Sequence, residues 1–183
     1  GALGEIAPGA PARSGALPAA LAGSGLSGEV FDRTGSFASI DDLIAQTTTQ
    51  ASPNFRFDAH TVAFGGFGES KTLGAFLGTA GQLTGSGANA AMTTIGIHLT
   101  GFVYLEAGDH LLTVRSDDGF LLKLGGEVIS SYAWERGFDG TSRQVSVSGG
   151  LYAVDLYYFQ NSGADGLRFE IDGATAGPAL FYK

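Results

Sequence analysis

The sequence of 183 residues contains no cysteine, so it can form neither a disulfide framework nor a zinc–thiolate site. Basic residues are also scarce, because ten Lys and Arg stand against 18 Asp and Glu and give a formal net charge of −8. Such a chain lacks the basic face that nucleic-acid backbones and anionic membranes require, but it is compatible with divalent cations. No apolar run approaches the roughly 20 residues that a membrane-spanning helix needs.

The residues that are abundant indicate one folded domain. Hydrophobic residues make up 44% of the chain, which is enough for a sizeable core, and 30 glycines against five prolines indicate many tight turns. Three of the five prolines fall in residues 1–24, where no periodicity holds. We therefore predict a linker or extended lead-in over 1–24 and one domain over 25–183.

Most of the domain shows the pattern of short β-strands joined by glycine turns. Apolar and polar residues alternate in several segments, as half-buried strands require, and 151–159 is a long aromatic and β-branched run. This pattern predicts an all-β sandwich or barrel of eight to ten strands. The expected strands are 28–32, 54–59, one or two within 93–105, 110–115, 120–124, 127–130, 143–147, 151–159 and 167–171.

Two short helices are expected within this β pattern. Ser39 is followed three residues later by Asp42, just before apolar residues, and this capping-box signal predicts a helix at about 40–46. Residues 72–78 form a second candidate, a single turn closed by Gly78, and 78–90 are predicted to be a loop. Asp41 and Asp42 suit a helix N-terminus, so an Asp-Asp pair does not by itself indicate calcium.

A second Asp-Asp pair, Asp117 and Asp118, stands where a strand should end and the next strand begins. Adjacent carboxylates raise each other's pKa, and a bound cation is the usual compensation. Oxygen ligands at loop spacing suit calcium. The pair therefore predicts a calcium-assisted binding site on an all-β domain, and the alternative is a polar turn with two solvated acids.

The stretch from about 92 to 171 resembles the PA14 domain, a β-sandwich with a jelly-roll-like arrangement. The resemblance rests on 99–110, on Ser116 to Ile129, on Trp134 and on 150–167, with matching order and spacing. Upstream, 25–31 and 72–78 are similar to the variant found in large bacterial adhesins. The resemblance covers about 150 residues.

In the lectin branch of that family, which includes yeast flocculins and epithelial adhesins, the resemblance implies a defined calcium site. Asp117 and Asp118 would be joined by a cis peptide and would both bind one calcium ion. A side-chain amide from Gln160 or Asn161, and backbone carbonyls from about Ser162 to Asp165, would complete the ligands, and the ion would take two hydroxyls of a terminal sugar. Alternatively, Gln160 and Asn161 only form a turn, because Asn tolerates left-handed backbone. Asp165 could be a ligand or an ordinary acidic residue of the loop.

Further residues could contact the sugar. Trp134 could stack on a sugar ring, although burial in the core is an equal alternative, and Arg136 and Asp139 could supply hydrogen bonds. The three histidines, His60, His98 and His110, lack metal-ligand spacing and are expected to be structural. No nucleotide fingerprint, hydrolase motif or zinc-protease motif is present.

These observations favour a calcium-dependent carbohydrate-binding module of a bacterial surface adhesin. We expect a monomeric domain within a larger secreted or cell-surface chain that binds terminal sugars or glycans and is not an enzyme. A glycoside hydrolase using the paired carboxylates is disfavoured, because one acid would need a raised pKa in an apolar pocket that this neighbourhood does not supply. The other alternative is a structural or protein-binding PA14 module without glycan specificity.

Overall fold

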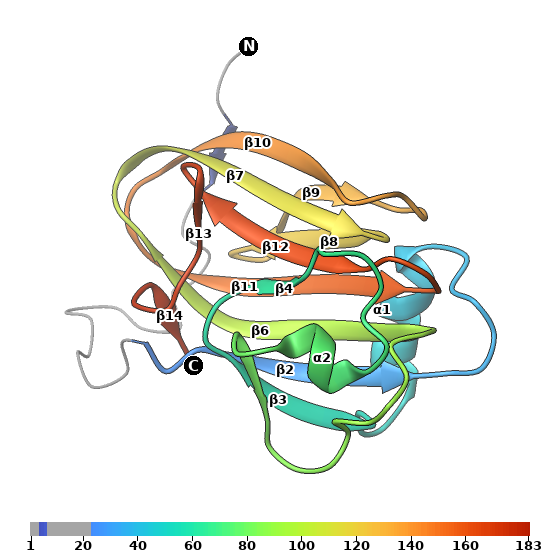
Figure 1. Ribbon diagram of the computed structural model, residues 1–183. Coiled ribbons are helices and arrows are strands. Elements are labelled where there is room, and N and C mark those ends of the chain that lie inside the picture. Colours follow the sequence, from blue (N-terminus) through green and yellow to red (C-terminus); the bar gives the residue numbers. More distant parts are fainter. Residues whose placement is uncertain (1–3, 7–22) are drawn as a thin grey trace.

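Two β-sheets packed face to face make up most of the chain in the computed structural model, which describes residues 4–6 and 23–183 (Figure 1). The first sheet contains β1 (Gly4–Ile6), β4 (Ala63–Gly65), β7 (Gly108–Asp117), β10 (Asp139–Val147), β12 (Gly166–Ile171) and β13 (Ala174–Thr175). The second contains β2 (Leu26–Asp32), β3 (Phe55–Ala59), β5 (Gly81–Leu83), β6 (Ile95–Leu105), β8 (Phe120–Leu124), β9 (Glu127–Tyr132), β11 (Gly150–Gln160) and β14 (Phe181–Tyr182). Two short helices, α1 (Ile40–Thr49) and α2 (Leu73–Leu77), complete the described fold. The predicted all-β sandwich is confirmed.

The strand order brings the ends of distant segments together. The first sheet runs β1-β10-β7-β12-β13, with β4 beside β12, and the second runs β5-β3-β2-β6-β11-β8-β9, with β14 beside β6. All pairs are antiparallel except β1 with β10, which are parallel. β7 and β11 therefore both end on the right in Figure 1, near the loop that precedes β10.

The sequence analysis did not predict several short strands. β4, β5, β13 and β14 have two or three residues each, too few to show a period of two. Each exists because a longer strand offers it hydrogen bonds, and β5, which pairs with β3, lies inside the predicted loop over 78–90. The predicted linker over 1–24 lies almost wholly outside the described residues, although Gly4–Ile6 within it forms β1.

The core fills the space between the sheets with side chains from both. Val114 and Phe169 come from the first sheet, and Ile97, Leu122 and Tyr158 come from the second, all fully buried. Burying each such side chain contributes about 1.5–3 kcal/mol. The outer faces carry the alternate residues of the same strands, so the alternation seen in the sequence is the alternation between core and surface.

Helix α1 packs on the outer face of the second sheet and forms a smaller core there. Its N-cap is Ser39, whose hydroxyl accepts a hydrogen bond from the backbone N–H of Asp41 at 3.2 Å. Leu43 packs so closely on β6 that a Cβ at Gly96 would lie 2.0 Å from its Cδ1. The helix ends at Thr49, three residues later than predicted, and neither described helix is long and apolar enough to cross a membrane.

Near the start of β7, His110 connects the residues that follow β6 and β12. Its ring nitrogens lie 2.7 Å from the carbonyl oxygen of Glu106 and 2.7 Å from Oδ2 of Asp172, whose other oxygen accepts the Leu111 N–H at 2.8 Å. Burial lowers the pKa of His110, but these two hydrogen bonds outweigh it and raise the pKa above the ordinary value of 6.5.

This arrangement predicts a pH-dependent stability. A histidine with a raised pKa in the folded state stabilises the fold fully below its unfolded pKa of about 6.5, and this stabilisation is lost as pH rises through the folded pKa. Chemical denaturation of His110→Gln should therefore show a flatter dependence of the unfolding free energy on pH above about 6.5. His60→Gln is the control, because the exposed His60 side chain makes no hydrogen bond among the described residues. Equal slopes in both variants would contradict the assignment.

Candidate functional site

Asp117 and Asp118 lie at the end of β7, joined by a cis peptide bond as the family resemblance implied. Both are buried, with 5% and 6% of their surfaces exposed. This burial excludes the polar turn with solvated acids. The pair occupies the right-hand end of the sandwich in Figure 1, where β7 and β11 both end.

Asp118 is held by residues of two other segments. Its Oδ2 accepts the backbone N–H of Asn161 at 2.9 Å, and its Oδ1 accepts the backbone N–H of Arg136 at 3.3 Å. Its own backbone N–H donates to the carbonyl of Phe159 at 3.1 Å. The Asp118 carboxylate is thus fixed between the end of β11 and the loop before β10.

Asp117 is fixed through its backbone. Its carbonyl oxygen accepts the hydroxyl of the buried Tyr158 at 2.6 Å, and Gly166 is its register partner on β12. The loop over 161–165, which connects β11 to β12, therefore begins beside Asp118 and ends beside Asp117.

Burial of this pair disfavours its negative charge. Burial and the neighbouring Asp118 carboxyl raise the pKa of Asp117 to about 7. Burial also raises the pKa of Asp118, in spite of the hydrogen bond from Asn161 that lowers it. The sequence argument expected each carboxylate to raise the pKa of the other, but it expected no apolar surroundings, because the neighbouring loops are rich in Ser, Gly and Asn. Burial is nevertheless the first cause of both raised pKa values. Acids that resist ionisation mark a place where a cation is favoured.

Gln160 contributes an unpaired oxygen to the same region. Its Nε2 donates to the carbonyls of Gly163 and Ala164 at 3.1 and 3.0 Å and so closes the loop. Its Oε1 is buried and has no hydrogen-bond partner. Buried acceptors are nearly always paired, so this oxygen is free to accept a hydrogen bond or to ligate a cation. Within the described residues no three His, Cys, Asp or Glu gather as metal ligands, and the oxygen set found here suits a hard cation.

The Asn161 side chain serves a different purpose. Its Oδ1 accepts the N–H of Phe37 at 2.8 Å, and its Nδ2 donates to the Phe37 carbonyl at 2.9 Å and to Oε1 of Glu135 at 2.6 Å. Asn161 therefore ties the segment before α1 to the site. The negative charge of Glu135 also raises the pKa of Asp118, although less than burial does. The sequence analysis did not identify Glu135, whose only signal was its place between Trp134 and Arg136.

The remaining predicted ligands lie in the connecting loop. Both carboxylate oxygens of the buried Asp165 accept hydrogen bonds from Ser70, from its N–H at 2.7 Å and from its hydroxyl at 2.8 Å. Asp165 thus attaches the loop after β4 to the site. Ser162 is exposed at the loop tip.

The three residues predicted to contact sugar differ in exposure. Trp134 is 61% exposed, so it is not a core residue. The half-buried Arg136 donates to Ser116 and Thr141 and lies 4.4 Å above the Tyr132 ring, which makes it a brace for the loop. Asp139 is exposed and caps the N–H of Gly140 at 2.7 Å.

Two further aromatic residues border the site and were not found from the sequence. Phe138 is 39% exposed, and Cβ atoms at Gly66 and Gly166 would lie 3.3 and 2.7 Å from its ring. Phe67, next to Gly66, is 93% exposed. Gly66 and Gly166, which allow the Phe138 ring to approach the backbone, were the available signal in the sequence.

The tight packing at Gly119 yields a prediction. A Cβ there would lie 2.6 Å from the Phe159 ring and 2.6 Å from the Tyr132 carbonyl oxygen, so Gly119→Ala should lower the unfolding free energy by about 1–3 kcal/mol. Gly137→Ala is the matched control, because a Cβ at Gly137 meets nothing within 4 Å. Thermal unfolding of both variants checks this, and equal melting temperatures would contradict the packing.

Comparison with known proteins assigns the fold. No protein-family model and no curated protein matches the chain. Among solved structures, the PA14 domain of the antifreeze protein MpAFP matches with a TM-score of 0.78 and 22% identity, over 93% of this chain and 95% of that one. The PA14 sugar-binding domain from an RTX adhesin matches with a TM-score of 0.74 and 24% identity, over 87% and 98%.

A more distant match is the A domain of epithelial adhesin 6 from Candida glabrata in complex with Galβ1-3GlcNAc, with a TM-score of 0.61 and 15% identity over 94% of this chain and 90% of that one. At these identities the likeness establishes the fold. The chain therefore has the fold of the PA14 domains found in such adhesins.

Proposed function

We propose that this domain is a calcium-dependent carbohydrate-binding module of a bacterial surface adhesin. It acts outside the cell as part of a larger secreted or surface-attached protein, and its partners are terminal sugars of cell-surface glycans. The observation that carries the proposal is the buried, unpaired Oε1 of Gln160, the last residue of β11, next to the loop that begins beside Asp118 and ends beside Asp117.

Three side chains are the proposed calcium ligands: Asp117, Asp118 and Gln160. Two carboxylates with raised pKa values gain most from a cation, and the amide oxygen otherwise has no partner. The side-chain amide of Asn161 already forms hydrogen bonds with Phe37 and Glu135. Of the two candidate amide ligands, we therefore propose Gln160. Calcium bound there supplies open coordination positions at which vicinal sugar hydroxyls replace water.

The surroundings of the pair support a sugar as the ligand. Trp134 and Phe138 are exposed around it, and an exposed aromatic ring can pack on the apolar face of a pyranose. Two of the similar structures support the same conclusion, because one is a sugar-binding domain of an adhesin and another was solved with a disaccharide. Affinity for one monosaccharide is expected to be weak, with adhesion coming from multivalency.

Two other functions are weighed against this proposal. A retaining glycosidase places its two carboxyls about 5–5.5 Å apart, on either side of the bond that it cleaves. Asp117 and Asp118 are instead adjacent residues at one strand end, and each carboxyl affects the pKa of the other. We therefore propose that the domain is not an enzyme, and release of reducing sugar on incubation with glycans would contradict this. A structural or protein-binding module is compatible with the antifreeze-protein neighbour.

The calcium site can be tested without a sugar. Millimolar calcium should raise the melting temperature relative to chelator, because a ligand that binds only the folded state stabilises it. Asp118→Asn should weaken calcium binding by about tenfold or more in calorimetry, since affinity follows the charge of the ligands. Asp109→Asn is the control, an exposed acid on the same strand. Equal calcium affinity in the two variants would sink the site assignment.

The sugar is tested with a glycan array at about 1–5 mM calcium, the range of weak extracellular calcium sites, and again in chelator. The expected result is a signal that requires calcium, is lost in Asp118→Asn and falls on glycans that share one terminal diol geometry. Calcium binding together with a blank array would favour the structural module instead. A signal that survives chelator would place sugar binding elsewhere on the domain.

A further inference from the structure

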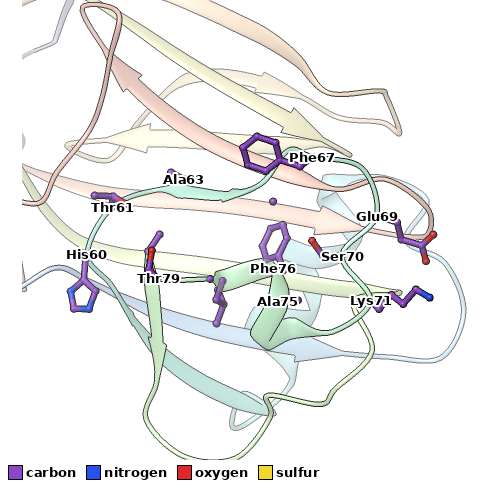
Figure 2. A pocket seen from close by; sticks show the side chains of 14 residues that line it. His60, Thr61, Ala63, Phe67, Glu69, Ser70, Lys71, Ala75, Phe76 and Thr79 are labelled. Atoms are coloured by element: carbon purple, nitrogen blue, oxygen red, sulfur yellow. The ribbon is translucent and has the colours of Figure 1, made fainter.

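A cavity of about 780 Å³ lies beside the aspartate pair, between β4, the loop over 66–71 and α2. Figure 2 shows Phe67 on one side of it and Phe76 of α2 on the other, with Glu69 and Lys71 at one end. Phe76 is buried and forms the floor, whereas Phe67 is 93% exposed at the rim. The volume lies within the range of about 300–1,000 Å³ that is typical of ligand pockets.

The cavity adjoins the proposed calcium site through two contacts. Ser70, which lines the cavity, donates two hydrogen bonds to Asp165 in the connecting loop. On the other side, the Phe138 ring rests on Gly66 and on Gly166, the register partner of Asp117. Asp165 and the Phe138 ring therefore link the edge of the cavity to the loop and strand beside the aspartates.

The lining of the cavity has the chemistry of a neutral polar ligand. Glu69, Lys71 and Thr79 are exposed around it, and neither charged side chain forms an ion pair among the described residues. One acid against one amine gives no net attraction for an anion or a cation. A fully exposed aromatic ring with hydroxyl, carboxylate and ammonium groups nearby offers both a stacking face and hydrogen bonds, as a pyranose requires.

From these contacts we infer that the cavity is a second sugar subsite, which takes the next residues of a neutral oligosaccharide whose terminal sugar occupies the calcium site. Phe67 is its stacking platform, and Glu69, Lys71 and Thr79 are its hydrogen-bonding groups. The inference rests on the proposed function. It makes the ligand an oligosaccharide rather than a single terminal sugar.

The test compares monosaccharides with matched trisaccharides. Calorimetry in calcium is carried out with the methyl glycosides of glucose, mannose and fucose, each beside a neutral trisaccharide that ends in the same sugar. The trisaccharide of the preferred sugar should bind about three- to tenfold more tightly, the gain expected from one aromatic contact. Phe67→Ala should remove that gain and leave monosaccharide affinity unchanged.

One further variant blocks the cavity, and another serves as a control. Ala75→Tyr adds bulk from the exposed face of α2 into the cavity, so it should also abolish the trisaccharide gain while the monosaccharide still binds. Val128→Ala truncates an apolar side chain that is 50% exposed and lies outside the cavity lining, so it should change nothing. In amide NMR spectra, the trisaccharide but not the monosaccharide should shift the signals of Phe67, Lys71 and Thr79.

The outcomes separate the two hypotheses. Equal affinity for monosaccharide and trisaccharide in the wild-type domain would overturn the subsite and leave the calcium lectin standing. A trisaccharide gain that survives both Phe67→Ala and Ala75→Tyr would also overturn it, because the added residues would then lie elsewhere. Absence of binding by all six probes would overturn the proposed function, and the subsite with it.

Discussion

The burial of two adjacent carboxylates at the end of β7 is the constraint on which the rest of this structure depends. Like charges in a desolvated place are unfavourable unless other groups compensate them. The fold supplies two backbone N–H groups to Asp118, a tyrosine hydroxyl to the Asp117 carbonyl, and a glycine that allows the neighbouring strands to close in. These contacts fix the pair but leave the pKa values of both carboxyls raised, which is the physical basis for the calcium ion that we propose there.

The groups around the pair come from segments far apart in the sequence, and the sandwich core determines where they meet. β7 and β11 lie in different sheets, and their ends approach because the apolar faces of both sheets pack together. Helix α1 adds a second support, since Leu43 anchors it on β6 and the segment before it reaches Asn161 through Phe37. The site is therefore rigid because it is continuous with the core, whereas its exposed rim of Trp134, Phe138 and Phe67 carries little of the stability.

The polar side chains at this end of the molecule have two different roles. Asn161, Arg136 and Asp165 use their side-chain groups to hold loops in place, and Gln160 alone among the predicted ligands outside the pair keeps a buried acceptor without a partner. Asp165 is the last residue of the connecting loop, and it also binds Ser70, which lines the cavity. The loop beside the aspartates thus holds one edge of the cavity, which is the physical basis for treating the two as one extended surface.

The sequence by itself determined the fold class, most of the long strands, the start of α1 at Ser39 and the position of the aspartate pair. It could do so because strand alternation, helix capping and glycine turns are local signals. Only the tertiary structure decided which neighbours of the pair are braces, because hydrogen bonds such as Asn161 with Phe37 join residues 124 positions apart. The raised pKa of Asp117, the exposure of Phe67 and the cavity beside it depend in the same way on burial between distant segments, which no local pattern records.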